Sequence, residues 1–516
     1  MLLAGLLAVA YLLVQPPSPD LAAQGFRADL FDAHGFLLWN DYWYSGHYLL
    51  SYSLLWPPFG AAVGPRLAGA LAAVAAAALF GALARRRYGD RARLGVLWFG
   101  AATATLLLAG QLTFALGVTL GLGSLLAAQR DRWTLGLALA ALCACASPVA
   151  GLFVALCGVA LAVAGPSRRG IALAAAALAP IAALALAFPS GGYFPFATTA
   201  FLPVPLFCVA ALVLLPPGER ALRVGVVLYG GLCVALFAFH TQVGANAARL
   251  GSLFGGPVLA LALAGRRPLA LAVIVAPLLY WQWVAPVRDL AAAWGEPSTT
   301  QAYYAPLIAE LDGRTGSVPA LVEVPPTRDR GEARYLAPRY PLARGWLRQL
   351  ESDDFDLFTG SRLTPGAYAR WLDDRGVAYV AVADAEPDYL GSDEEALIRG
   401  GLPFLRPIWA NRHWRLYRVR GSPGLVSTLG DPGAPAGSRA RLTALGPASF
   451  TLRADRPESL LVRLHHTPYW TVTSGSACAG SAGSWTRVDV RRAGEVEVSA
   501  RFSLEGLLRR DRECSG

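Results

Sequence analysis

Apolar segments separated by short polar turns fill the first 290 residues, and this pattern restricts the chain to folds that place helices in a membrane. Alanine, glycine and leucine dominate the segments, which suits close contact between helices in lipid. Hydrophobic residues make up 55% of the 516 residues, too many for an ordinary soluble protein. We therefore predict a helical bundle of about eleven membrane spans, at residues 1–14, 67–84, 94–110, 112–128, 133–147, 148–164, 170–188, 201–215, 224–240, 251–264 and 269–285.

The arginines of this region fall in alternate turns, which predicts the orientation of the bundle. Five turns are rich in arginine, whereas the turns between them contain Arg249 alone. Since arginine is retained on the cytoplasmic side, we expect a cytoplasmic N-terminus, an outer first loop at 17–65, and an extracytoplasmic chain after 286. The formal charge of +10 is explained by this topology, because no basic block or nucleic-acid motif is present. The first segment lacks a cleavage site, so we expect an uncleaved membrane span. It is shorter than a full span, so the residue at which this span begins is left undecided.

Three regions follow from the change of composition along the chain. Residues 1–288 form the transmembrane domain with its large first outer loop. Residues 289–422 have mixed charge and predict an extracytoplasmic α/β domain, with strands at 320–324, 377–383 and 414–419. Residues 423–516 contain runs that alternate with period two, such as SFTLRA and VEVSARF, and predict an extracytoplasmic β-sandwich.

The cysteines divide by environment. Five lie in apolar segments, where cysteine acts as a small hydrophobic residue. Cys478 and Cys514 lie in the region placed outside, where disulfides persist, so we predict a bond between them that ties the C-terminal tail to the sandwich. No spacing of residues indicates a metal site or a nucleotide-binding glycine motif.

A polar stretch in the first loop, residues 29–58, is the main candidate site. Asp29, Asp32 and Asp41 are its carboxylates, and a carboxylate at the membrane surface can take a proton from an acceptor hydroxyl. We expect Asp29, then Asp32, to be catalytic and Asp41 to bind substrate. His47 beside a glycine is a candidate for binding phosphate or sugar. The alternatives are that the carboxylates cap helices or face water, and that the histidine and aromatic residues form an interfacial belt.

A second candidate group is HTQVGANAARLGSLFGGP at 240–257. Arg249 begins an apolar segment, and a charge there indicates function because it is costly to leave unpaired. Arginine binds phosphate through two parallel hydrogen bonds, and a helix N-terminus adds its dipole. Asn246, His240 and Gln242 are the expected neighbours of Arg249, and Gln111 completes the outer face. We expect Asn246, His240 and Gln111 to bind substrate together with Arg249. The alternatives are snorkelling, or an ion pair between Arg249 and an aspartate of the first loop.

The sequence resembles the GT-C superfamily of polytopic membrane glycosyltransferases. The stretch DLFDAHGFLLWNDYWYSGHY…LLWPP looks like the first loop of bacterial members, including the YfhO-type group. GQLTFALG, ASPVAGLF and GANAARLGSLFGGP look like blocks of a branch of integral membrane proteins from high-GC Gram-positive bacteria. The resemblance implies that the loop-one acid, Asp29 or else Asp32, acts as a base or assists a divalent metal. The adjacent Asp-Glu pair of protein mannosyltransferases is absent.

The resemblance implies transfer of a sugar, as a hexosyl- or pentosyltransferase, from a polyprenyl-phosphate donor to a glycan or glycolipid acceptor of the cell envelope, usually with inversion. No cofactor is predicted from the residues themselves, and a divalent metal is left open. One alternative is a non-catalytic protein of the same fold that binds lipid-linked sugar or acts as a scaffold. A transporter or flippase is the other alternative, disfavoured because we find no internal repeat.

Overall fold

The computed structural model describes residues 1–165, 167–359, 361–429 and 440–508, and these form two compact units. The helical unit comprises Met1–Gly35 and Ser51–Trp294. The C-terminal unit comprises Gly295–Gly516 together with Phe36–Leu50, a piece of the first loop. The sequence predicted that the whole loop 17–65 would go with the membrane region, whereas residues 36–50 pack with the C-terminal unit.

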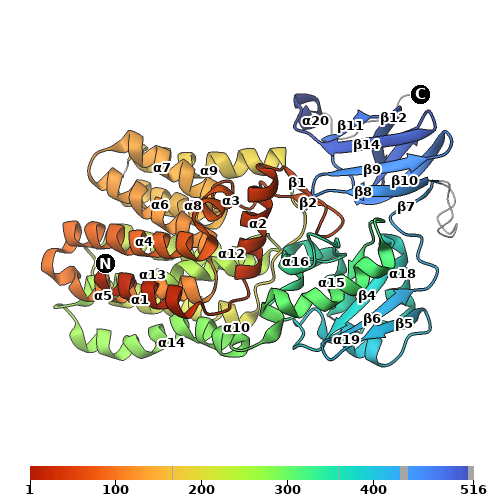
Figure 1. Cartoon of the computed structure of the whole chain (residues 1–516). Coiled ribbons are helices and arrows are strands. Elements are labelled where there is room, and N and C mark those ends of the chain that lie inside the picture. The colour runs from red at the N-terminus through yellow and green to blue at the C-terminus, as the bar shows by residue number, and fades with distance from the viewer. Residues whose placement is uncertain (166, 360, 430–439, 509–516) are drawn as a thin grey trace. The chain divides into compact units, whose positions relative to one another are not determined.

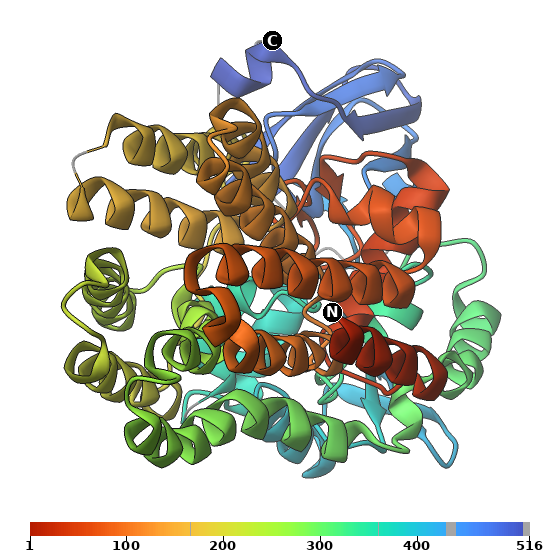
Figure 2. The same ribbon diagram turned by 90° about the vertical axis from the view of Figure 1, so that its left-hand side faces the viewer.

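The helical unit consists of helices that lie side by side (Figures 1 and 2). Each of the predicted apolar segments overlaps at least one of them. The helices are α1 (Leu2–Val14), α2 (Leu21–His34), α3 (Trp56–Val63), α4 (Pro65–Tyr88), α5 (Arg93–Leu108), α6 (Leu112–Gln129), α7 (Trp133–Ala146), α8 (Pro148–Ala164), α9 (Arg168–Ala187), α10 (Thr198–Phe201), α11 (Pro203–Leu214), α12 (Arg220–Ala238), α13 (Ala248–Leu263) and α14 (Pro268–Ala293).

The helical unit is that of a multi-pass membrane protein. Over the described residues, six helical stretches are long and apolar enough to cross a membrane: Pro65–Leu108, Leu112–Gln129, Arg168–Ala187, Arg220–Ala238, Gly244–Leu263 and Pro268–Ala293. The first of these contains both α4 and α5. The shorter apolar helices are Leu2–Val14, Trp133–Ala146, Pro148–Ala164 and Thr198–Leu214. The number of membrane crossings therefore stays a prediction.

Small residues allow these helices to approach closely. Where α8 meets α9, a Cβ on Gly158 would lie 2.7 Å from the Gly170 carbonyl oxygen, and a Cβ on Gly170 would lie 2.6 Å from that of Gly158. A polar side chain inside the bundle satisfies one backbone group that a proline leaves open. Pro257 has no N–H for the carbonyl of Leu253, and Gln282 Nε2 of α14 donates to that oxygen at 3.2 Å. Such contacts hold helices together in lipid.

The α/β part of the C-terminal unit is built on a mixed four-stranded sheet in the order β3-β4-β6-β5. Strands β3 and β4 are parallel and the other pairs are antiparallel. The bounds are β3 (Val322–Glu323), β4 (Tyr379–Ala383), β5 (Leu405–Ala410) and β6 (Trp414–Val419), with helices α15 (Gln301–Thr315), α16 (Glu332–Tyr335), α17 (Ser352–Phe358), α18 (Pro365–Arg375) and α19 (Ser392–Arg399). The predicted α/β organisation is confirmed.

The sandwich has two antiparallel sheets, in the orders β12-β13-β10-β7 and β11-β14-β9-β8. Its strands are β7 (Val426–Thr428), β8 (Ala440–Leu445), β9 (Ser449–Ala454), β10 (Glu458–His465), β11 (Trp470–Ser474), β12 (Ala477–Ala482), β13 (Trp485–Val490) and β14 (Gly494–Ala500), followed by a short helix α20 (Leu504–Leu508). The predicted β-sandwich is confirmed. Cys478 lies on β12, but Cys514 lies outside the described residues, so their disulfide stays a prediction.

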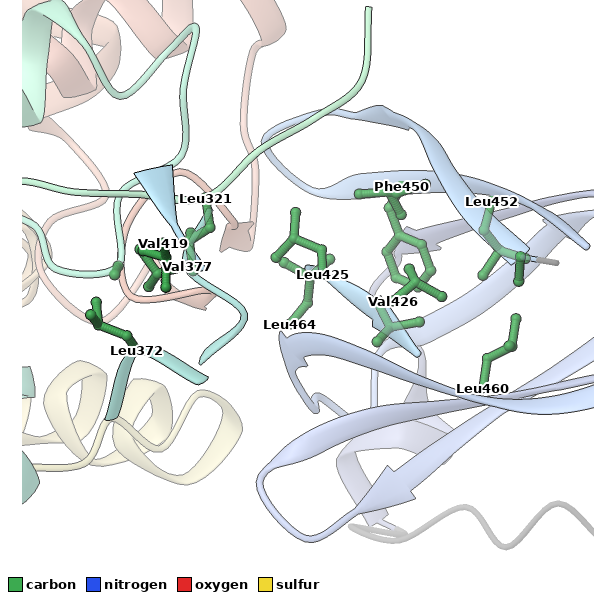
Figure 3. Packing of buried hydrophobic residues seen from close by; sticks show 14 of the residues in the cluster. Leu321, Leu372, Val377, Val419, Leu425, Val426, Phe450, Leu452, Leu460 and Leu464 are labelled. Atoms are coloured by element: carbon green, nitrogen blue, oxygen red, sulfur yellow. The ribbon is translucent and has the colours of Figure 1, made fainter. Parts of the chain in front are cut away.

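One hydrophobic core runs through both parts of the C-terminal unit. Leu321, Val377 and Val419 fill it under the mixed sheet, and Phe450 and Leu460 fill it between the sandwich sheets. Figure 3 shows Leu425 and Leu464 between these two groups. Because the core is continuous, we describe the α/β part and the sandwich as one unit.

Residues 36–50 are built into this unit through contacts with both of its parts. Trp43 is fully buried, and its indole N–H donates to the Ala333 carbonyl at 2.9 Å. The Tyr44 backbone N–H donates to Leu342 at 3.1 Å. On the sandwich side, the His465 N–H donates to the Ser45 carbonyl at 2.7 Å. The pairing of β1 (Trp39–Asn40) with β2 (His47–Tyr48) closes the inserted segment into a hairpin.

Candidate functional site

Helix α2 presents two different faces at one end of the helical unit. Three polar residues lie on one face of this helix, because they follow at positions i, i+4 and i+7. They are Asp20 at the N-cap, Gln24 and Arg27. Gln24 is fully buried and Arg27 is 3% exposed. The helix is anchored by Trp56, whose indole N–H donates to the Gln24 carbonyl at 3.2 Å. A charged group is therefore held rigidly against the apolar bundle.

Arg249 and Asp20 form an ion pair between α13 and α2. The guanidinium Nη2 and the carboxylate Oδ2 are 3.9 Å apart, a long separation for an ion pair, and the side chains are 25% and 18% exposed. The guanidinium also lies 5.5 Å from the ring centre of Phe114 on α6. Arg249 thus forms an ion pair with an aspartate of the first loop, which is one of the two alternatives that the sequence left open. A loose, partly exposed pair can exchange its carboxylate for a phosphate at small cost.

A second guanidinium lies in the same cluster. Arg27 lies over the ring of Tyr52, 3.7 Å from its centre. Burial lowers the pKa of Arg27, while Tyr52 and the charge of Asp20 raise it. Among the described residues, the amide nitrogen and oxygen of Gln24 are buried without a hydrogen-bond partner. We call Asp20, Gln24, Arg27, Tyr52 and Arg249 the arginine cluster. Its two cations and one carboxylate give it a net positive charge.

The turn between α5 and α6 fixes the start of α2 beside this cluster. A Cβ on Gly110 would lie 2.5 Å from Ser18 Oγ and 2.8 Å from the Leu21 backbone nitrogen, and its φ of +68° also favours glycine. The predicted Gln111 follows as the N-cap of α6, the helix that carries Phe114. The structure thus brings Gln111 and Arg249 to the same end of the bundle.

The other residues predicted near Arg249 lie in the segment before α13. Asn246 is half-buried in the 3₁₀ turn Gly244–Ala247, directly before that helix. His240 is exposed and stacks on Tyr193, with ring centres 4.3 Å apart. Gln242 donates its amide N–H to the carbonyls of Ser190 and Gly191, which joins the segment before α10 to the segment before α13. These contacts give His240 and Gln242 a part in shaping the turns.

The predicted catalytic carboxylates lie on the other side of α2. Asp29 and Asp32 are both exposed. At 100° per residue, Asp29 points opposite to Asp20, and nine residues separate them by about 13 Å along the helix axis. The structure therefore does not bring Asp29 and the arginine cluster to one point. Asp20 is the first-loop carboxylate beside Arg249.

Asp41 and His47 belong to the C-terminal unit. Asp41 is fully buried, and its Oδ1 accepts the indole N–H of Trp39 at 2.8 Å. Burial raises the pKa of Asp41 well above its usual range, and the Trp39 hydrogen bond only partly opposes this. His47 is buried and its ring stacks on Trp43 with centres 5.6 Å apart. Their substrate-binding roles stay predictions, whereas the contacts described give them a part in packing the inserted segment.

Replacing Asp41 with asparagine is expected to stabilise the C-terminal unit at neutral and alkaline pH. An unfolded aspartate ionises near pH 4, whereas the folded pKa is raised, so the wild type loses stability as the pH rises above about 4. Asparagine keeps the acceptor for Trp39 and removes this loss. Unfolding free energies measured between pH 4 and 8 should show a difference that grows with pH. Asp455→Asn, an exposed control, should give no growing difference, and parallel curves for Asp41→Asn would contradict the expectation.

The residues that the structure describes do not gather into a metal site. No group of three or more histidine, cysteine, aspartate or glutamate side chains among them is placed to hold an ion. The divalent metal that the family resemblance left open stays an untested prediction. The reaction steps proposed for this chain use its own residues and no metal.

Sequence reasoning missed three members of the arginine cluster, namely Asp20, Gln24 and Arg27. These residues lie in DLAAQGFR at 20–27, directly before the aromatic stretch 29–58 on which the prediction was based. The i, i+4, i+7 spacing of the three polar residues was the signal that could have found them.

Comparison with known proteins gives matches to solved structures alone. Neither a family model nor a curated protein matches the chain. ArnT from Cupriavidus metallidurans in the apo state is similar with a TM-score of 0.42 and 14% identity, covering 80% of this chain and 97% of that chain. The archaeal oligosaccharyltransferase AglB from Archaeoglobus fulgidus, in complex with an inhibitory peptide and a dolichol-phosphate, is similar with a TM-score of 0.34 and 12% identity, covering 71% of this chain and 66% of that chain.

Proposed function

We propose that this chain is a membrane-embedded glycosyltransferase that transfers a sugar from a polyprenyl-phosphate donor to an extracytoplasmic acceptor of the cell envelope. The observation that carries the proposal is the arginine cluster, in which Arg249 and Arg27 share one neighbouring carboxylate, Asp20. Charges at the end of an apolar bundle are costly, and two guanidiniums that neighbour the same carboxylate suit the binding of a phosphate. A prenyl chain in the bilayer would present its phosphate at this level.

The arginines would act on the leaving group. The acceptor hydroxyl oxygen attacks the anomeric carbon, the bond from that carbon to the phosphate oxygen breaks, and polyprenyl phosphate leaves with one additional negative charge. Guanidiniums placed beforehand around this phosphate stabilise the charge as it develops in the transition state. Arg249 is suited to this because its pair with Asp20 is long and partly exposed.

A carboxylate must accept the proton of the acceptor hydroxyl. Asp20 is the favoured base because it lies beside Arg249. A phosphate that binds to Arg249 would displace the Asp20 carboxylate, which could then accept the proton. Asp29 and Asp32 are the bases that the sequence indicated, and they lie on the exposed side of α2. The assay described next separates these assignments.

The test is turnover by purified protein in nanodiscs with labelled polyprenyl-phosphate hexoses and pentoses, measured as release of polyprenyl phosphate. Arg249→Ala is expected to lower turnover about 100-fold or more, the usual loss for one preorganised donor. Arg93→Ala, in an exposed pair with Asp90, is the matched control and should leave turnover unchanged. Asp20→Asn and Asp29→Asn identify the base. Equal turnover of wild type and Arg249→Ala would overturn the proposal.

Donor binding measured with the same variants distinguishes the alternative. A non-catalytic protein of this fold would bind the labelled donor in a way that depends on Arg249 and would release no polyprenyl phosphate. This outcome would replace the transferase by a binding or scaffold protein. A protein that neither binds nor turns over any donor would refute both.

A further inference from the structure

The β5–β6 hairpin of the C-terminal unit carries an exceptional concentration of positive charge. Between residues 405 and 420 the chain has no aspartate or glutamate. Its arginines are all exposed: Arg406, Arg412, Arg415, Arg418 and Arg420. The hairpin lies at the edge of its sheet, because β5 is the outermost strand in the order β3-β4-β6-β5. Arg406 therefore lies on the edge strand, and Arg415 and Arg418 lie exposed on the strand next to it.

The hairpin does not neutralise these charges itself. Arg406 and Arg418 lie directly opposite each other on paired strands, an arrangement that costs stability. None of the five arginines forms an ion pair with any residue that the structure describes. Elsewhere in this unit many arginines are paired with carboxylates, among them Arg314, Arg328, Arg330, Arg339, Arg344, Arg348, Arg362, Arg375, Arg399, Arg456 and Arg487. An anion from outside would relieve the repulsion.

Apolar and aromatic side chains are interleaved with the arginines. Ile408, Trp409 and Tyr417 are half-buried and leave part of their surface accessible on the hairpin. Tryptophan and tyrosine favour the head-group region of a bilayer, where arginine binds lipid phosphate. The C-terminal unit is also covalently joined to a membrane-spanning unit at three points, after Gly35, Leu50 and Trp294.

We propose that the β5–β6 hairpin is a docking surface for the anionic head groups of a phospholipid bilayer. The three chain connections to a membrane-spanning unit favour a bilayer over a soluble polyanion as the occupant. Docking would hold the C-terminal unit at the membrane surface. The proposal does not depend on the glycosyltransferase assignment, because it rests on the charge, exposure and pairing of this hairpin.

The experiment is arginine modification by phenylglyoxal, read by mass spectrometry, on the full-length protein in nanodiscs of phosphatidylcholine alone or mixed with phosphatidylglycerol. The hairpin arginines are expected to react about fivefold more slowly in the anionic nanodiscs. About 1 M salt, where the Debye length is about 3 Å, should remove the protection. Arg441 and Arg492, exposed on the sandwich, should react equally in both lipids.

Two matched double variants complete the test. Arg406→Gln with Arg418→Gln should weaken the lipid-dependent protection of Arg412 and Arg415, whereas Arg441→Gln with Arg492→Gln removes the same charge and should preserve it. Equal modification rates of the hairpin in both lipids would overturn the proposal. Protection by soluble polyphosphate without protection by anionic nanodiscs would also overturn it, in favour of a polymer partner.

Discussion

Replacing Arg344 with methionine is expected to lower the free energy of unfolding of the C-terminal unit by about 3 to 5 kcal/mol. Arg344 is buried and contacts two buried carboxylates. Its Nε and Nη2 donate to Glu323 at 2.9 and 2.6 Å, and Nη2 also donates to Glu394. Nη1 donates to the Leu390 carbonyl at 3.0 Å, and the guanidinium lies over Phe358. Methionine fills similar space but leaves both carboxylates without their cation.

The effect of Arg344→Met should depend on pH. Burial already raises the pKa values of Glu323 and Glu394, and Arg344 is the main influence that lowers them. Without it both pKa values rise further, whereas unfolded glutamates ionise near pH 4.3. The folded state then holds protons that the unfolded state has lost, so stability falls as the pH rises. The loss should be smaller at pH 5 than at pH 8.

Hydrogen exchange of β4 and β6 amides in the intact, purified protein measures this loss as a lower opening free energy. Arg399→Met is the matched control, because Arg399 pairs with Glu395 at an exposed i, i+4 position and should contribute about 0.5 kcal/mol or less. Adding Glu323→Gln and Glu394→Gln to Arg344→Met should recover part of the stability. Unchanged exchange in Arg344→Met would contradict the role of this network.

Replacing Trp43 with alanine is expected to destabilise the C-terminal unit by about 3 to 5 kcal/mol, the cost of removing a buried tryptophan side chain. The Trp43 indole donates to Ala333 and stacks on His47. A Cβ on Gly345 would lie 2.6 Å from Trp43 Cβ, so the backbone closes tightly on this residue. The variant should therefore leave a cavity that the surroundings cannot fill.

Comparing Trp43→Phe with Trp43→Ala separates the loss of the hydrogen bond from the loss of the whole side chain. Trp43→Phe keeps an aromatic ring and loses the hydrogen bond to Ala333, so it should cost distinctly less than Trp43→Ala. Proteolysis within residues 36–50 should accelerate in the order wild type, Trp43→Phe, Trp43→Ala. A Trp43→Ala protein with wild-type exchange and proteolysis would show that the inserted segment adds nothing to the core.

Local patterns predicted most of the elements of the fold. Strand β6 begins and ends at the residues predicted, Trp414 and Val419, because it is rich in the aromatic and β-branched residues that favour strands. Strand β12, with the sequence ACAGSA, was missed because its small residues carry no β-branched or aromatic signal. The apolar helices were predicted from continuous apolar runs between polar turns, because a helix satisfies its own backbone hydrogen bonds in lipid.

The site was predicted less well, because its contacts join distant segments. Arg249 was predicted because an isolated charge in an apolar segment is costly. An ion pair with an aspartate of the first loop was considered, but Asp20 was not identified as that aspartate. Asp29 was preferred for its position in the loop, but only the helix geometry of α2 shows which face it occupies. The sequence places Asp41 near a membrane, and only its partners in the fold place it inside the C-terminal unit.

The insertion of residues 36–50 also has a consequence during synthesis. The Trp43 indole and its acceptor Ala333 are 290 residues apart in the chain. At about 5 to 20 residues per second, the ribosome needs roughly 15 to 60 s to supply that acceptor. Throughout this interval the aromatic-rich segment 36–50 exists without its eventual neighbours in the C-terminal unit. The hydrophobic core of that unit can therefore be completed only late in synthesis.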